Sequence, residues 1–162
     1  MKNLILKGFS IKHSIQKLIK GGISLVIPNH ETQVYVRFGE TDAAGHVNNT
    51  SHFLYFEEGR TKFFKEFFSK RDTSTGFILA AIKCDYINQA YAGQILKVVS
   101  SVIKVGYKSF TIEQKLINTV NGQTTAIAEA VSVFFDYTEQ KTIPIPEDYK
   151  EILLSLKIAK SS

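Results

Sequence analysis

Polar and apolar residues follow a helical period in the middle of the chain and strand-like periods on both sides of it. From Asn49 or Thr50 to Lys70, phenylalanines recur every three or four residues, as they do along one face of an α-helix. Further apolar residues widen this face well beyond one stripe, so the helix must be largely covered by other structure. Gly59, in its middle, costs roughly 1 kcal/mol relative to alanine. We interpret it as a point where another backbone approaches closely.

Short segments with strand composition surround this helix. They are residues 32–38 before it and residues 77–89, 94–105, 109–119 and 123–137 after it. Asn121-Gly122, between the last two, is a strong signal of a type I′ hairpin turn. Beyond Pro144 and Pro146, residues 147–159 begin with acidic side chains and predict a short helix.

Short turns between successive strands require antiparallel pairing. The pattern therefore predicts an α+β domain, in which a five-stranded antiparallel sheet wraps the long central helix and a short C-terminal helix follows. This architecture is called the hotdog fold, and we expect it to comprise residues 31–162. Residues 1–30 are predicted to form a short N-terminal extension, with an amphipathic helix at about residues 11–20. The sheet edge that such a fold leaves exposed predicts a homodimer, and two dimers can pair into a tetramer.

Composition and charge narrow the classes of function. The 162 residues carry a formal net charge of +5, and five lysines in the first 30 residues face no Asp or Glu. The remaining positive charge is scattered, without the basic run of a nucleic-acid patch, whereas a phosphate-rich group such as the tail of coenzyme A suits it. No stretch approaches the ~18 continuous apolar residues of a membrane span. The single cysteine, Cys84, excludes an intramolecular disulfide and a cysteine-built zinc site, and we expect a cytoplasmic protein.

The chemistry-bearing residues crowd into residues 37–49, which end where the long helix begins. A helix N-terminus offers unpaired backbone N–H groups and a partial positive charge, which polarise a carbonyl and stabilise a developing oxyanion. The carboxylate of Asp42 supplies a group that can deprotonate water or attack the carbonyl directly. No Ser–His–Asp elbow, His-Glu metal motif or phosphate-cradling glycine loop occurs elsewhere in the chain. Hydrolysis at this site needs neither a metal nor a cofactor.

Residues 38–45, with the sequence FGETDAAG, resemble the hotdog acyl-CoA thioesterases of the 4-hydroxybenzoyl-CoA thioesterase type. The resemblance continues through Glu57 and Arg60 in an E-x-x-R pattern, residues 108–110 and residues 145–149, and it covers roughly residues 33–149. It implies that the protein is an acyl-CoA thioester hydrolase that releases a carboxylic acid and coenzyme A, which is part of the substrate. The aromatic residues Phe53, Phe56, Phe63 and Phe67 are assigned to the core rather than to an acyl pocket.

The resemblance also assigns roles to individual residues. Asp42 falls on the catalytic aspartate, and Asn49 on the residue whose backbone N–H polarises the thioester carbonyl. His46, in a His-Val-Asn-Asn run, is similar to the histidine of acyl-ACP thioesterases of the same fold, but Ala44 stands where those enzymes carry a catalytic asparagine. A carrier-protein thioester is therefore an alternative substrate. Asn48 is expected to line the substrate site or to cap the helix.

A second set of residues is expected to contact substrate. Lys104, Lys108 and Ser109 lie around a strand break, in a region that contacts coenzyme A phosphates in the family. Glu57 is interpreted as a second carboxylate near the thioester, or as half of a buried ion pair with Arg60. Two other functions fit the same fold: a hydratase or dehydratase that acts on acyl thioesters, and a non-catalytic acyl-CoA-binding module.

Overall fold

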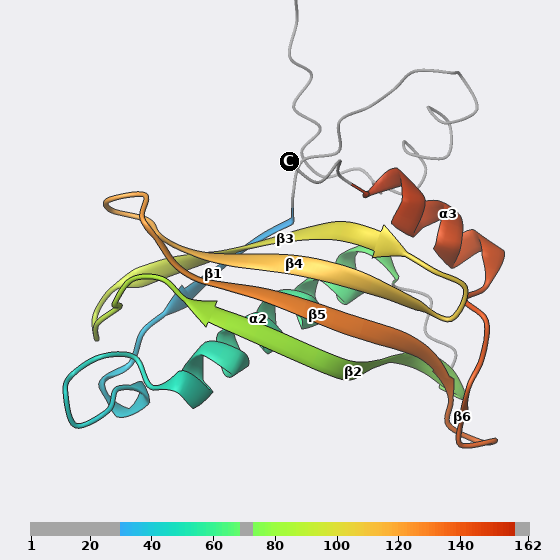
Figure 1. Cartoon of the computed structure of the whole chain (residues 1–162), viewed down its shortest axis with the longest axis horizontal. Helices are drawn as coiled ribbons and strands as arrows, with labels where there is room; N and C mark the ends of the chain where they lie inside the picture. The colour runs from blue at the N-terminus through green and yellow to red at the C-terminus, as the bar shows by residue number, and fades with distance from the viewer. Residues whose placement is uncertain (1–29, 69–72, 158–162) are drawn as a thin grey trace, which may run out of the picture.

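The computed structural model describes residues 30–68 and 73–157 of the chain. The amphipathic helix predicted at residues 11–20 lies outside these residues. Figure 1 shows a curved sheet with the helix α2 along one face and the helix α3 beside the end of strand β3. The predicted α+β hotdog architecture is confirmed.

The sheet is antiparallel, and its strands lie in the order β1-β3-β4-β5-β2. The strands are β1 (His30–Tyr35), β2 (Thr75–Tyr86), β3 (Ile95–Val105), β4 (Ser109–Asn118) and β5 (Thr124–Asp136). All five predicted strands are present. A short sixth strand, β6 (Lys141–Thr142), was not predicted; it pairs with the end of β5 because the chain folds back on itself there.

Two local predictions are wrong. The first strand ends at Tyr35, and Phe38–Glu40 form a 3-10 helix, η1, because the side chain of Glu40 turns back to accept the backbone N–H of Arg37 at 2.8 Å. The turn between β4 and β5 is not type I′, which needs positive φ at both central residues. Only Gly122 has one, at 71°, and its N–H donates to the carbonyl of Asn118 across a longer loop.

Helix α2 (Asn49–Phe67) packs mainly against β3 and β1, and also meets β4. A Cβ atom at Gly59 would lie 2.6 Å from Val98 Cγ1 and 2.9 Å from Gln114 Nε2, so only glycine lets the helix come this near. The predicted close approach is found, but side chains of β3 and β4 make it rather than a backbone.

The core divides into two clusters along α2. The cluster at its N-terminal end is mixed, and it includes Tyr55, Phe56 and the β3 residues Leu96 and Val98. The other cluster, at the C-terminal end of α2, is mostly aromatic and also receives Leu153 from α3 (Glu147–Ser155). Of the four predicted core phenylalanines, Phe56, Phe63 and Phe67 are buried and Phe53 is half-buried.

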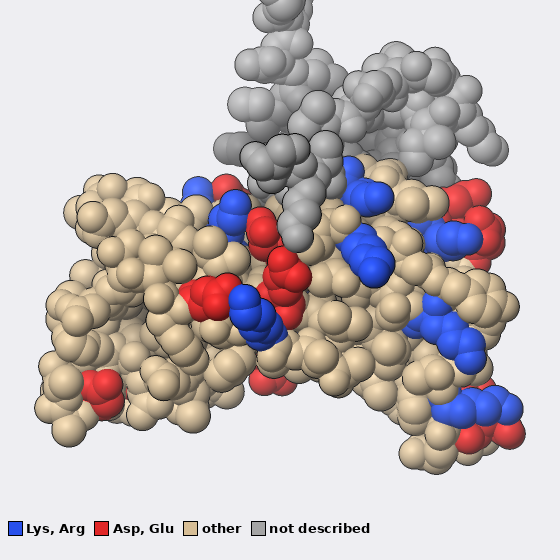
Figure 2. Space-filling view, in the orientation of Figure 1, with Lys and Arg blue, Asp and Glu red and all other residues tan. Residues whose placement is uncertain are grey.

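Charged side chains are unevenly spread over the surface. Figure 2 shows them mainly over the middle and right-hand parts of the visible face, whereas the left-hand end carries few. That end holds the loop before α2 and the last residues of β2.

Candidate active site

The loop that carries Asp42 is a tight, self-paired turn. The N–H of Asp42 donates to the carbonyl of His46 at 2.8 Å, and the N–H of Gly45 donates to the carbonyl of Asp42 at 3.0 Å. Thr41 and Val47 form a bridge at its base. Gly45 has a φ of 81°, which favours glycine because L side chains rarely adopt it. The turn therefore holds Asp42 in a set position directly before α2.

The two carboxylate oxygens of Asp42 have different roles in this turn. Oδ1 accepts the backbone N–H of Ala44 at 2.9 Å and that of His46 at 3.2 Å. Oδ2 has no hydrogen-bond partner among the described residues. The first oxygen fixes the carboxylate, and the second remains available to a water molecule or a substrate.

A second set of bonds ties the loop to α2 through Glu40. Its carboxylate accepts the hydroxyl of Tyr55 at 2.7 Å and pairs with Arg37 at 2.9 Å. Its backbone carbonyl accepts the N–H of Asn48 and the hydroxyl of Ser51, each at 2.9 Å. Burial acts to raise the pKa of the Glu40 carboxyl, but the hydrogen bonds and Arg37 outweigh it, and the pKa lies below its ordinary value.

The first turn of α2 leaves one backbone donor unused. Asn48 caps the helix: its side-chain oxygen accepts the N–H of Thr50 at 3.1 Å. Its carbonyl accepts the N–H groups of Ser51 and His52 at 3.0 and 3.3 Å. Within residues 30–68 and 73–157, the N–H of Asn49 has no partner, so it is the free donor at the positive end of the helix.

These groups open into one cavity of about 500 Å³. Its lining includes Asp42, His46 and Asn49 from the predicted site, together with His52, Tyr86 and residues 87–90. The structure therefore brings the three predicted catalytic residues together. The ring of His46 lies edge-on to Tyr91, with the centroids 5.3 Å apart.

Sequence reasoning missed His52 and Tyr86. His52 is buried, its Nδ1 lies 3.1 Å from the carbonyl of Asn48, and its ring stands edge-on to Tyr86 at 5.1 Å. Burial lowers the pKa of His52, and the bond to Asn48 opposes this only in part. His52 could have been found from the sequence, because a residue three positions after Asn49 lies on the same side of a helix. Tyr86 could not, because it lies 37 residues away from Asn49 in the sequence.

The residues predicted to contact phosphates lie elsewhere in the protomer. Ser109 pairs with Val133 of β5, opposite the beginning of β2, whereas Tyr86 ends β2 at the other end of the sheet. Lys104 and Lys108 flank the same β3–β4 turn and are exposed. One chain alone does not bring these three residues to Asp42.

The predictions for Glu57 need correction. Its side chain is exposed rather than buried, and no ion pair within 4.0 Å joins it to Arg60 in the described part of the chain. Arg60 turns into the interior instead and donates to Gln114 Oε1 at 3.0 Å. Burial lowers the pKa of Arg60, and the charge of Glu57 opposes this. Glu57 stays at the surface because an exposed carboxylate keeps its hydration, whereas burial beside Arg60 would cost a desolvation penalty that the pair must offset.

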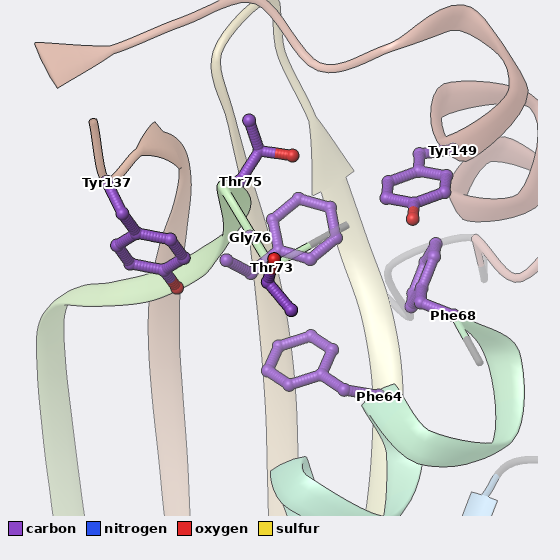
Figure 3. Close-up of a pocket in the computed structure, with 8 residues that line it drawn as sticks. Phe64, Phe68, Thr73, Thr75, Gly76, Tyr137 and Tyr149 are labelled. Carbon is purple, nitrogen blue, oxygen red and sulfur yellow. The ribbon is translucent and has the colours of Figure 1, made fainter. Parts of the chain in front are cut away.

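A second cavity, of about 330 Å³, lies at the C-terminal end of α2. Figure 3 shows aromatic rings around it from α2, from the segment after β5 and from α3. Its lining residues are Phe64, Phe68, Thr73, Thr75, Gly76, Phe77, Tyr137 and Tyr149. The rings of Phe64 and Phe77 are stacked at 5.5 Å, so the cavity has a firm apolar wall.

The described residues contain no group of three or more His, Cys, Asp or Glu side chains able to hold a metal ion. Among them, no helix is long and apolar enough to cross a membrane.

An antiparallel sheet around one long helix is the hotdog architecture, and Asp42 and Asn49 lie at the start of that helix. The sequence model of the thioesterase-like superfamily matches residues 36–153, and the chain belongs to this family. The protein is a thioester hydrolase, as its sequence predicts.

Two curated relatives and one solved structure are similar to this chain. The chain is 32% identical to the protein YsmA of Bacillus subtilis over 123 residues, which cover 75% of this chain and 83% of YsmA. It is 27% identical to the acyl-CoA thioesterase YbgC of Helicobacter pylori over 127 residues, or 73% of this chain and 95% of YbgC. The structure of a predicted thioesterase from Bacillus stearothermophilus superposes with a TM-score of 0.74 at 30% identity, covering 81% of this chain and 98% of that one.

Proposed function

We propose that this protein hydrolyses acyl-CoA thioesters and that Asp42 Oδ2 is the reacting carboxylate oxygen. The observation that carries the proposal is that Asp42 and Asn49 line one cavity, while Asp42 Oδ2 and the Asn49 N–H have no hydrogen-bond partner among the described residues. The relative YbgC, named as an acyl-CoA thioesterase, supports the substrate class.

In the proposed reaction, Oδ2 takes a proton from water, and the water oxygen forms a bond to the thioester carbon. The π electrons move onto the carbonyl oxygen, where the Asn49 N–H and the helix dipole stabilise the negative charge. When the intermediate collapses, the C–S bond breaks, and coenzyme A leaves as a thiolate that takes up a proton. A carboxylic acid remains.

Direct attack by Oδ2 is the other route and gives an Asp42–acyl anhydride, which water then opens. Single turnover in ¹⁸O-labelled water distinguishes the two. General-base catalysis places the label only in the product acid. Attack by Oδ2, followed by hydrolysis at the aspartyl carbon, leaves it in Asp42.

We also propose that the reaction uses no metal or cofactor, since one carboxylate and one backbone donor account for every charge that develops. EDTA is then expected to leave turnover unchanged. A loss of activity that added metal restores would contradict this.

The main test is thiol release from a panel of acyl-CoA esters. Asp42→Asn keeps an oxygen for the turn but loses the base, and we expect a fall of about 10²–10⁴-fold. The control is Asp148→Asn, because Asp148 is an exposed aspartate in the first turn of α3, outside both β2 and the cavity. A folded Asp42→Asn variant with full activity would overturn the mechanism.

Consumption of enoyl-CoA without thiol release would favour a hydratase, and tight binding without turnover would favour a binding module.

We propose further that the working unit is a homodimer joined through β2. This strand is the sheet edge opposite β1, it has twelve residues, and Leu79, Ala80 and Ala81 at its centre are exposed. A long apolar edge strand is a template for a second strand unless it is covered. Asp42 is exposed in the single chain, and a second copy would exclude bulk water from it.

Antiparallel pairing about a two-fold axis between Ala80 and Ala81 would place Thr75 of one chain opposite Tyr86 of the other. Because Thr75 lines the aromatic cavity and Tyr86 lines the Asp42 cavity, the two cavities would become neighbours across the interface. Phe77 contacts α2 residues and so does Tyr86, so both cavities open on the face of the sheet that carries α2. We propose that the aromatic cavity of one chain receives the acyl group whose thioester is cleaved by the other.

The same two-fold axis would turn the β3–β4 end of one chain toward the Asp42 end of the other. We propose that Lys104, Lys108 and Ser109 act there, on the phosphates of coenzyme A. Replacing both lysines with alanine should raise KM for acyl-CoA but not for the acyl-pantetheine ester, which lacks those phosphates. Lys62→Ala, on the exposed side of α2, is the control. An equal rise for both esters would contradict a phosphate contact.

A further inference from the structure

His52 is a histidine of the candidate site that the proposed reaction does not use. It lies in the first turn of α2, it is only 4% exposed, and it lines the same cavity as Asp42 and Asn49. No element of the proposed mechanism requires a histidine at this place, and a purely apolar contact with Tyr86 would not require one either.

The hydrogen bond to Asn48 decides which nitrogen of His52 faces the cavity as an acceptor. A backbone carbonyl only accepts, so the 3.1 Å contact means that Nδ1 carries the hydrogen and donates. In the neutral ring, Nε2 then carries the lone pair. Nε2 has no hydrogen-bond partner within the described residues, and the ring is held from the side by Tyr86.

The surroundings of His52 keep this acceptor available at neutral pH. Burial lowers the pKa of the ring below its ordinary 6.5, against the opposing effect of the Asn48 carbonyl. The titratable groups around it are Tyr55 on its own helix, Tyr86 at the end of β2, and Asp42 and His46 from the loop across the cavity. The ring is therefore mostly neutral at pH 7, with its lone pair on Nε2.

We propose that His52 is a further catalytic residue, which accepts one hydrogen of the attacking water through Nε2 while Asp42 Oδ2 accepts the other. A water molecule held by two acceptors directs an oxygen lone pair away from both of them, toward the thioester carbon. The inference rests on the proposed function, because it assigns a second contact to the same water. The proton that leaves the water still goes to Asp42, and His52 only fixes its orientation.

Two substitutions separate the two nitrogens of His52. In His52→Asn, the amide nitrogen can replace Nδ1 and keep the bond to Asn48, but nothing replaces Nε2. In His52→Gln, the longer amide can place its oxygen where Nε2 was. We expect kcat to fall about tenfold or more in His52→Asn with KM within about twofold, and to stay near the wild-type value in His52→Gln.

The pH profile gives a readout that a merely structural role would not change. Protonation turns Nε2 into a donor, so kcat/KM of the wild type should fall as the pH drops through the pKa of His52. In His52→Gln this acid limb should move to lower pH. If His52→Asn does not fold, as shown by its thermal unfolding, the acid limb of His52→Gln decides the question.

A double variant tests whether His52 and Asp42 act on one water. Once Asp42→Asn has removed the base, adding His52→Asn should slow the reaction little further. Wild-type kcat in a folded His52→Asn variant would overturn the role of His52 and leave Asp42 untouched, and so would an unmoved acid limb in His52→Gln. Full activity of Asp42→Asn would instead overturn the proposed function, so the two failures are distinguishable.

Discussion

At the scale of single residues, hydrogen bonds separate the groups proposed to react from the supporting ones. Asp42 Oδ1 and the Asn48 side chain accept backbone N–H groups, whereas Asp42 Oδ2 and the Asn49 N–H have no partner among the described residues. Glu40, in the same short stretch as Asp42, differs from it because its carboxylate is engaged by Arg37 and Tyr55. The two acids therefore differ in their surroundings: Glu40 braces the loop, whereas Asp42 keeps the oxygen that we propose to react.

Glu40 should make the stability of the protein depend on pH. Its pKa is lowered in the folded state, so its ionised form stabilises the fold above its ordinary value of 4.5, and this contribution is lost as the pH falls through the lowered pKa. We expect Glu40→Gln to reduce the free energy of unfolding by about 1 kcal/mol at pH 7. The difference from wild type should shrink in acid.

Urea unfolding between pH 3 and 7 measures this difference. Glu58→Gln is the control, since Glu58 forms only an exposed ion pair with Lys62, and such pairs contribute about 0–1 kcal/mol. A Glu40→Gln effect of the same size at every pH would argue against the loop brace.

At the scale of elements, α2 links the two cavities. Its first turn presents the free N–H and His52 to one cavity, and its last turns present Phe64 and Phe68 to the other. Gly59, between them, lets the helix lie close against β3 and β4. The helix therefore sets both cavities on one face of the sheet but keeps them apart within a single chain.

Tyr137 is a place to change the aromatic cavity without disturbing the fold. It lines the cavity, lies close to Gly76 and is 42% exposed, so its loss should cost little stability. We expect Tyr137→Ala to shift the ratio of kcat/KM values toward bulkier acyl groups by about tenfold. A panel from acetyl-CoA to aromatic acyl-CoA esters measures this shift. Tyr107→Ala, at an exposed tyrosine outside the cavity, is the control. An equal change in the ratio of kcat/KM values in both variants would refute the proposal that the aromatic cavity receives the acyl group.

At the scale of the whole molecule, the exposed edge of β2 leaves the site open in a single chain. A dimer about a two-fold axis would cover Asp42 and bring the second cavity beside it, so specificity and catalysis would come from different copies. The surface of one chain alone does not enclose the thioester site.

A charge at the centre of β2 should therefore abolish both assembly and turnover. In Ala81→Asp, each new carboxylate would lie opposite Ala80 of the other chain and diagonal to the second carboxylate, so like charges would repel each other across the strand pair. We expect a monomer by light scattering after size exclusion, with unchanged circular dichroism and little thiol release. Gln33→Asp, which places the same charge on the β1 edge, is the control. A fully active dimeric Ala81→Asp protein would contradict pairing through β2.

Periodicity and turns along the chain were enough to predict the long helix, the five main strands and their antiparallel pairing, because these depend on local spacing. The resemblance of residues 38–45 to a known family predicted the class of enzyme and singled out Asp42 and Asn49. Only the tertiary structure showed that Asp42 Oδ2 has no partner in the described part of the chain, that Glu57 is exposed, and that Tyr86 lies against His52. These facts depend on which atoms meet across the sheet, and a pattern of residue types along one chain does not contain that information.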